Sequence, residues 1–281
     1  MRLSTKKHDR DAAGFLYVYP VVSRRAQGVS IGVNLNPNNA CNWRCAYCQV
    51  PNLERGASPE IDLDRLRDEL TLMLEDVVQG DFMQREVPEG SRRLNDIALS
   101  GNGEPTTSKQ FDDVLAVIET VLEKIGILGE VRVVLITNGS LIQRDVVQNG
   151  LARMARMHGE VWFKLDSATP EGVRRMNDSD LAPERVETNL RRAAELCRTK
   201  IQTCVLAYDG EAPSEAEQQA YLDFLERQVQ AKVPLHGVLL YGLERQSHQP
   251  EAARISKLGP EWLAAFARRI EQTGLEVSVH E

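Results

Sequence analysis

Short apolar runs rich in β-branched residues alternate along the chain with longer segments whose apolar residues recur at helical spacing. The runs that predict strands are VSIGVNL (29–35), DIALSG (96–101), VRVVLIT (131–137), VWFKLD (161–166), IQTCVLAY (201–208) and HGVLLYG (236–242). Strands that alternate with helices are typical of repeated βα units around a parallel sheet. The pattern therefore predicts an α/β fold with six parallel strands.

Five segments between or after these runs carry an apolar stripe that predicts an amphipathic helix. The stripes are Leu63, Leu66, Leu70 and Met73; Phe111, Val114, Ile118 and Leu122; Val186, Leu190 and Ala193; Leu222, Leu225 and Val229; and Trp262, Phe266 and Ile270. Ser214 and Glu217 have the spacing of a capping box, which predicts the start of the helix after the fifth strand. Gly274 is placed to end the last helix before LEVSVH.

The domain organisation follows from the absence of any Gly/Ser-rich or Pro-rich linker in the sequence. The longest interval between predicted strands, 49–95, holds one predicted helix and the polar stretch QGDFMQREVPEGSRR, which indicates a surface loop or insertion. We predict a single domain over residues 1–281. It would comprise an N-terminal extension (1–20), a βα core (about 21–245) and a C-terminal helix and strand (246–281).

Composition and charge narrow the class of protein. No run approaches the roughly 18 apolar residues of a membrane span, and the first residues lack the apolar core of a signal peptide. Five cysteines, three of them in one loop, make a poor disulfide framework, so we expect a reducing compartment and a cytoplasmic protein. A formal charge of -7 disfavours non-specific nucleic-acid binding but leaves room for a local basic pocket.

The segment ACNWRCAYCQVPN (40–52) places Cys41, Cys45 and Cys48 at separations of four and three positions. The thiolates of an iron–sulfur cluster converge on one inorganic core, and this spacing suits a loop that wraps around it. A structural zinc site needs four ligands, and the histidines of the chain are remote from this loop. Three ligands on a four-iron cluster leave one iron open to a substrate or cofactor.

The three cysteines, with aromatic Tyr47 just before the last, resemble the radical S-adenosylmethionine (radical SAM) superfamily. The resemblance implies a partial (β/α)6 TIM-like barrel with parallel strands and a [4Fe-4S] cluster on Cys41, Cys45 and Cys48. It also implies that S-adenosylmethionine binds the fourth iron and is cleaved by one electron into methionine and a 5′-deoxyadenosyl radical, which removes hydrogen from a substrate. A low-potential flavodoxin or ferredoxin would supply the electron.

Three later segments fit the cofactor-binding parts of that family. LSGNGEPT (99–106) resembles its GGEP motif with Asn102 in place of a glycine, ITNGS follows the third strand, and KLDSAT ends the fourth. The resemblance implies contacts to S-adenosylmethionine from Tyr47, Ser100, Gly101, Asn102, Gly103, Glu104, Asn138, Lys164, Asp166 and Ser167. Ordinary turns at these strand ends, together with a surface Lys–Asp pair, are the alternative interpretation.

The block upstream of the cysteines, with SRR at 23–25 and GVSIGV at 28–33, is similar to radical SAM proteins related to wyosine synthases, which modify a tRNA guanine. Those enzymes carry a second cluster, and only Cys197 and Cys204 remain here to hold one. Two cysteines cannot supply that second cluster, so the substrate of those enzymes is not carried over to this chain. RNA stays one candidate substrate, and the acidic charge of the chain weakens it further. Arg24 and Arg25 could bind a carboxylate or phosphate. The polar segment 241–260 is a candidate substrate loop through Tyr241 and Arg245.

Two other functions remain open for the cysteine loop. It could pin the fold of a non-enzymatic structural or interaction domain through a bound metal. It could also hold a cluster used for electron transfer or sensing. A reducible four-iron cluster that cleaves S-adenosylmethionine would distinguish the radical SAM enzyme from both.

Overall fold

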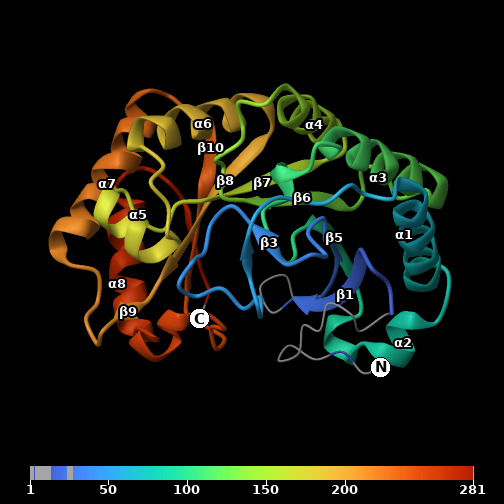
Figure 1. The fold of residues 1–281 in the computed structure, drawn as a ribbon, viewed down its shortest axis with the longest axis horizontal. Helices are drawn as coiled ribbons and strands as arrows, with labels where there is room; N and C mark the ends of the chain where they lie inside the picture. Colours follow the sequence, from blue (N-terminus) through green and yellow to red (C-terminus); the bar gives the residue numbers. More distant parts are fainter. Residues whose placement is uncertain (1–2, 4–13, 24–27, 281) are drawn as a thin grey trace. The chain divides into compact units, whose positions relative to one another are not determined.

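The structure, a computed structural model, describes Leu3, residues 14–23 and residues 28–280 (Figure 1). The chain forms two compact units. The first comprises Met1–Ala40, Gly56–Ile136 and Arg144–Glu160, and the second comprises Cys41–Arg55, Thr137–Gln143 and Val161–Glu281. Arg24 and Arg25, predicted to bind an anion, lie outside the described residues.

The strands of the first unit follow the order β1 (Val18–Ser23), β2 (Gly28–Val33), β5 (Leu94–Leu99) and β6 (Arg132–Thr137). β2 pairs parallel to β5 and β5 pairs parallel to β6, whereas β1 pairs antiparallel to β2. All six residues of β2 are buried, as expected for a strand inside a parallel sheet. β1 was not predicted. Its proline interrupts a β-branched run, and an edge position tolerates this residue.

The helices of the first unit are α1 (Leu63–Val78), α2 (Phe82–Glu86), α3 (Phe111–Ile125) and α4 (Asp145–Arg156), together with the short 3-10 turns Glu89–Ser91 and Pro105–Thr107. α3 packs against both α1 and α4 (Figure 1). The predicted stripes of α1 and α3 are buried apart from one partly exposed residue, Leu63, at the start of α1. The polar stretch predicted as a loop contains α2, so that part of the prediction was incomplete.

α4 is a helix that the apolar pattern did not predict. It buries only Val147, Leu151 and Met154 as large apolar residues, and Gly150 lies in its middle. Glycine weakens a helix interior, which obscured the pattern. A Cβ at Gly150 would come within 2.6 Å of the ring of Phe111 in α3. The glycine therefore permits the close approach of the two helices.

Most of the second unit's sheet consists of β7 (Gly159–Lys164), β8 (Arg198–Val205), β10 (Leu235–Gly242) and β12 (Val277–His280), in that order. β10 is parallel to both β8 and β12. Two short ladders lie outside this sheet. β9 (Ala207–Tyr208) pairs with β11 (Ile255–Ser256), and β3 (Ala40–Cys41) pairs with β4 (Glu54–Arg55).

The helices of the second unit are α5 (Pro170–Asn177), α6 (Pro183–Leu196), α7 (Glu215–Gln230) and α8 (Pro260–Glu271), with a 3-10 turn at Pro250–Arg254. α6 packs on β8 and α8 on β10. The predicted capping box is present, because Ser214 and Glu217 each bond to the other's backbone at the start of α7. α8 ends three residues before Gly274, which has a positive φ of 95°.

α5 was also not predicted. Only eight residues long, it buries Val173 and Met176 as its apolar side chains. Thr169 accepts a hydrogen bond from the N–H of Gly172 at its start, and Asp178 ends it in the left-handed conformation with φ 49°. Local capping and tertiary packing, rather than a long apolar stripe, therefore stabilise α5.

All six predicted strands form, and the predicted α/β class with a largely parallel sheet is confirmed. The prediction of one domain over residues 1–281 stays a prediction. Within the described part of the chain, no helix is both long and apolar enough to cross a membrane.

Candidate functional site

The cysteine loop of the second unit packs against the C-terminal end of α5. The N–H of Ala46 donates to the carbonyl of Met176 at 2.8 Å, and the N–H of Arg44 donates to the carbonyl of Asn177 at 3.2 Å. A turn brings the N–H of Cys48 to the carbonyl of Cys45 at 2.9 Å. The three loop cysteines form no disulfide and are half-buried. The helix end that was missed in the sequence thus fixes the backbone on which these thiols lie.

A second segment, Ser247–Gln249, holds the other side of the loop. The Ser247 hydroxyl donates to the carbonyl of Ala46 at 2.7 Å, and the His248 N–H donates to that of Cys48 at 2.9 Å. The Gln249 amide donates to the carbonyl of Val50 at 3.0 Å and to that of Cys48 at 3.4 Å. The side chains of Ser247 and Gln249 are buried. The 247–249 segment therefore supplies hydrogen-bond donors to loop carbonyls.

Gln249→Ala is expected to loosen the cysteine loop. It removes the amide donor to the carbonyl of Val50 and one of the donors to that of Cys48, which keeps its bonds from Ser247 and His248. Loss of the donor to a buried carbonyl costs about 1–3 kcal/mol. We expect a lower melting temperature and faster loss of bound iron to a chelator, measured by calorimetry and by iron release. Gln219→Ala, at an exposed position of α7 whose amide bonds Asp223, is the control. Equal iron release from the two variants would contradict a holding role for Gln249.

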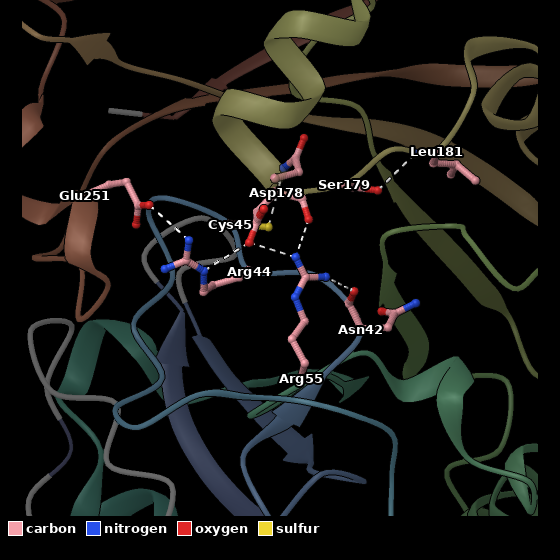
Figure 2. Close-up of polar contacts among 9 residues, drawn as sticks. Asn42, Arg44, Cys45, Arg55, Asp178, Ser179, Leu181 and Glu251 are labelled. Atoms are coloured by element: carbon pink, nitrogen blue, oxygen red, sulfur yellow. Dashed lines mark hydrogen bonds and ion pairs between the residues drawn. The ribbon is translucent and has the colours of Figure 1, made fainter.

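Four charged side chains on the surface, namely Arg44 of the cysteine loop, Arg55, Asp178 and Glu251, form ion pairs beside the end of α5 (Figure 2). Asp178 accepts from Arg44 at 3.1 Å and from Arg55 at 2.8 Å, and Arg44 also reaches Glu251 at 3.2 Å. Burial works against the Asp178 carboxylate, but hydrogen bonds from both arginines lower its pKa below the usual value. Because Asp178 is half exposed, each pair is expected to contribute no more than about 1 kcal/mol.

A buried polar network lies behind the loop and is centred on Asp166, at the end of β7. Its carboxylate accepts from the Tyr47 hydroxyl, from the Asn177 amide at 2.7 Å and from the N–H of Cys204 at 2.9 Å. The Lys164 ammonium lies 3.2 Å from the Tyr47 hydroxyl and 5.0 Å from the centre of its ring. The network thus connects two strand ends of the second unit to the loop.

Burial and neighbouring charges shift the pKa values of three side chains in this network. Burial disfavours the charged form of Lys164, but attraction to the ionised forms of Cys45 and Tyr241 and to Asp166 outweighs it and raises the pKa of the ammonium. Burial, reinforced by the Asp166 charge, raises the pKa of Tyr47 well above its usual value. Burial also raises the pKa of the Cys45 thiol, against the opposing effect of Lys164. Lys164 is therefore the positive charge beside these groups.

The remaining predicted residues of the second unit have their own partners. Asn138 donates to the side chain of Asn42 at 2.8 Å and accepts from Ser140, so it borders the residue after the first cysteine. The Ser167 hydroxyl lies 3.3 Å from Thr169, near the start of α5. Nothing in the sequence indicated that the side chains of Asn42, Asn138 and Ser140 would bond to one another.

Tyr241 and Arg245, predicted to contact substrate, both border the cysteine loop. Tyr241 is buried in one apolar cluster with Ala46 and Tyr47. Arg245 donates to the side chain of Gln49 at 3.3 Å. Contact with substrate stays a prediction for both residues.

The GNGEP turn belongs to the first unit and is tightly packed there. Asn34 accepts from the N–H of Asn102 at 3.1 Å, and a Cβ on Gly101 would lie 2.3 Å from the same oxygen. A Cβ on Gly103 would lie 2.0 Å from the carbonyl of Ala40. Both glycines are therefore required by close approach of the backbone.

Two side chains of this turn have partners within the first unit. Glu104 is buried and accepts from the N–H of Thr106 at 3.1 Å and from its hydroxyl at 2.6 Å. The Ser100 hydroxyl lies 3.1 Å from that of Tyr19. Cofactor contact stays a prediction for these residues as well.

The donor set of the cysteine loop fits an iron–sulfur cluster. Three cysteines without a disulfide lie within eight residues, and an amide N–H donor faces one of the sulfurs. Among the described residues, no three His, Cys, Asp or Glu side chains are arranged to hold one metal ion. A four-iron cluster makes a different demand, because each thiolate binds a different iron atom.

Comparison with solved structures shows that the fold is shared. The structure of TYW1 with a lysine-pyruvate adduct bound has a TM-score of 0.57 and 17% identity, over 88% of this chain and 74% of that chain. A radical SAM methyltransferase from Sphaerobacter thermophilus has a TM-score of 0.60 and 15% identity, over 94% of this chain and 68% of that chain. These likenesses confirm the predicted fold class, an α/β partial barrel.

Sequence comparison adds two curated relatives and a family. UPF0026 protein slr1464 from Synechocystis is 25% identical over 58% of this chain and 53% of its own length. The GTPase Obg of Brachyspira hyodysenteriae is 26% identical over 47% of this chain. The chain spans about half the length of the first and 17% of the second. The family model described as Radical SAM superfamily matches residues 35–218, more than half of the chain. The chain therefore belongs to the radical SAM superfamily.

Proposed function

We propose that the protein binds a [4Fe-4S] cluster through Cys41, Cys45 and Cys48 and cleaves S-adenosylmethionine to start a hydrogen abstraction from its substrate. When bound, the cluster supplies the electron that breaks the sulfonium bond to the 5′ carbon, giving methionine and a 5′-deoxyadenosyl radical. The observation that carries the proposal is a loop with three cysteines that form no disulfide, held on both sides by backbone hydrogen bonds, in a chain of this superfamily.

The protein's own groups orient the reactants and limit access of water. The loop carbonyls are bonded by Ser247 and Gln249, which keeps the thiol-bearing backbone in one conformation. Lys164 provides a buried positive charge for an anionic group, and Asp166 fixes the hydroxyl of Tyr47. Asn138 and Ser167, with the turn 100–104, are the further groups that we assign to S-adenosylmethionine.

The partners follow from the same chemistry. A cluster at low potential requires a low-potential electron donor, and we propose a flavodoxin or a ferredoxin. The similarity of the upstream block to wyosine-synthase relatives makes an RNA nucleoside one candidate substrate. The net charge of -7 makes broad contact with a nucleic-acid backbone unfavourable, so such a substrate would be held locally.

Anaerobic reconstitution with iron and sulfide tests the proposal. We expect a brown protein with about four irons per chain, a reducible signal in electron paramagnetic resonance and 5′-deoxyadenosine on addition of dithionite and S-adenosylmethionine. The protein without iron, treated in the same way, is the control. A colourless protein that retains stoichiometric zinc and yields no 5′-deoxyadenosine would refute the proposal.

A further inference from the structure

Asn177, the last residue of α5, has contacts that the proposed chemistry does not yet use. Its side chain is 1% exposed. The amide nitrogen lies 3.4 Å from the sulfur of Cys45 and 2.7 Å from a carboxylate oxygen of Asp166 (Figure 2 shows the surroundings of Cys45 at this helix end). The backbone carbonyl of Asn177 accepts from the N–H of Arg44. One buried residue therefore contacts both the backbone and a thiol of the cysteine loop.

The contact with Asp166 determines which end of the amide faces the sulfur. An ionised carboxylate only accepts hydrogen bonds, so the group of Asn177 beside it must be the NH2. The same nitrogen lies beside Cys45, and its second hydrogen is free to point at the sulfur. Asp166 is held in turn by Tyr47 and by the N–H of Cys204. The amide is thus fixed as a donor to Cys45.

A hydrogen-bond donor at a cluster sulfur raises the reduction potential of the cluster. Reduction adds one negative charge to a cluster and its thiolates, and a partial positive hydrogen at a sulfur stabilises that charge. Hydrogen bonds to the sulfurs therefore help set the reduction potential. A half-buried carboxylate nearby, such as Asp166, has the opposite effect, because it repels the added electron and is screened less than a surface charge.

We propose that Asn177 is a positioning residue that raises the reduction potential of the cluster by donating to Cys45, while Asp166 orients the amide and lowers the potential through its charge. The proposal rests on the proposed function, since it requires a cluster on the loop. It makes α5 the element that adjusts how easily the cluster accepts an electron. The two residues are expected to act with opposite signs.

The test is a redox titration of the reconstituted protein without S-adenosylmethionine, followed by electron paramagnetic resonance. Asn177→Leu and Asn177→Ala should shift the midpoint potential to more negative values, because the donor is lost. Asp166→Asn should shift it to more positive values, because a negative charge is lost while a donor remains possible at Asn177. Iron content and circular dichroism confirm that each variant is folded and loaded.

Asn189→Ala is the matched control. Asn189 is fully buried in α6 of the same unit and donates to the carbonyl of Gly139 at 2.8 Å. Its loss removes a buried amide without touching the cysteine loop, so the midpoint potential should stay unchanged. If the Asn177 variants do not fold, the Asp166→Asn variant still tests the proposal, because the proposal requires its midpoint potential to be more positive than that of the unmodified protein.

The outcomes separate this inference from the proposed function. A normal four-iron signal with midpoint potentials equal to the control overturns the role of Asn177 and leaves the function intact. Shifts of the same sign in the Asn177 and Asp166 variants indicate general loosening and also overturn it. A wild-type protein that assembles no four-iron cluster overturns the proposed function, and this inference with it.

Discussion

Replacing any one of Cys41, Cys45 or Cys48 by Ala is expected to abolish the cleavage of S-adenosylmethionine. Two thiolates cannot hold a four-iron cluster whose fourth iron must stay open, so each variant should lose the reducible signal together with activity. We expect 5′-deoxyadenosine formation to fall to the level of the protein without iron. The measurements are iron content, electron paramagnetic resonance and chromatography of the nucleoside after reduction with dithionite.

Cys197→Ala is the matched control for that series. Cys197 is buried, forms no disulfide and directly follows α6, outside the loop. The loss of a small buried group costs some stability, but the cluster and the cleavage should remain. A loop variant that retains a four-iron signal and full turnover would show that its cysteine is not a ligand. Loss of the signal in Cys197→Ala alone would point to a ligand set different from the proposed one.

Gly103→Ala is expected to impair both stability and binding of S-adenosylmethionine. The added Cβ would lie 2.0 Å from the carbonyl of Ala40 and 2.7 Å from the Asn36 side chain, so the backbone must move. Overpacking of this kind costs about 1–3 kcal/mol. For a chain of this size we expect a melting temperature lower by about 2–4 °C for each kcal/mol. Calorimetry measures the unfolding and also the affinity for S-adenosylmethionine.

The control for this glycine is Gly90→Ala. A Cβ at Gly90 would meet no atom within 4 Å, so the substitution adds a methyl group without a clash. Its melting temperature and cofactor affinity should match those of the unmodified protein. Should Gly103→Ala bind S-adenosylmethionine as tightly as Gly90→Ala, the assignment of the turn 100–104 to the cofactor would be wrong.

The strands could be predicted because their signal is local. Runs such as VRVVLIT (131–137) are β-branched and bounded by polar residues, and the strand β6 covers nearly the same positions. The stripe of α3 was equally clear, since Phe111, Val114 and Ile118 recur on one face. α4 was missed because Gly150, which lets it approach α3, interrupts its apolar pattern. α5 was missed because it is short and its caps, rather than an apolar stripe, stabilise it. Their stability comes from partners that a local pattern does not contain.

The sequence predicts which thiols would bind a cluster, and this stays a prediction, whereas it gives no sign of the residues that hold their loop. The spacing of the cysteines and the aromatic Tyr47 identify the superfamily, and they need no tertiary information. Asn177, Ser247 and Gln249 act through contacts with residues more than 130 positions away in the chain. A single amide or hydroxyl carries no pattern, so nothing in the sequence distinguishes these three from ordinary surface residues. Only the folded chain identifies them.

The distance along the chain between the cysteine loop and the 247–249 segment has a consequence for biogenesis. Ser247 follows its partner Ala46 by 201 residues. At a synthesis rate of about 5–20 residues per second, the loop leaves the ribosome roughly 10–40 s before the residues that hold it are made. During that interval the three thiols lie on an unsupported segment, exposed to oxidation and to stray metal ions. Cluster insertion is therefore expected to follow completion of the chain.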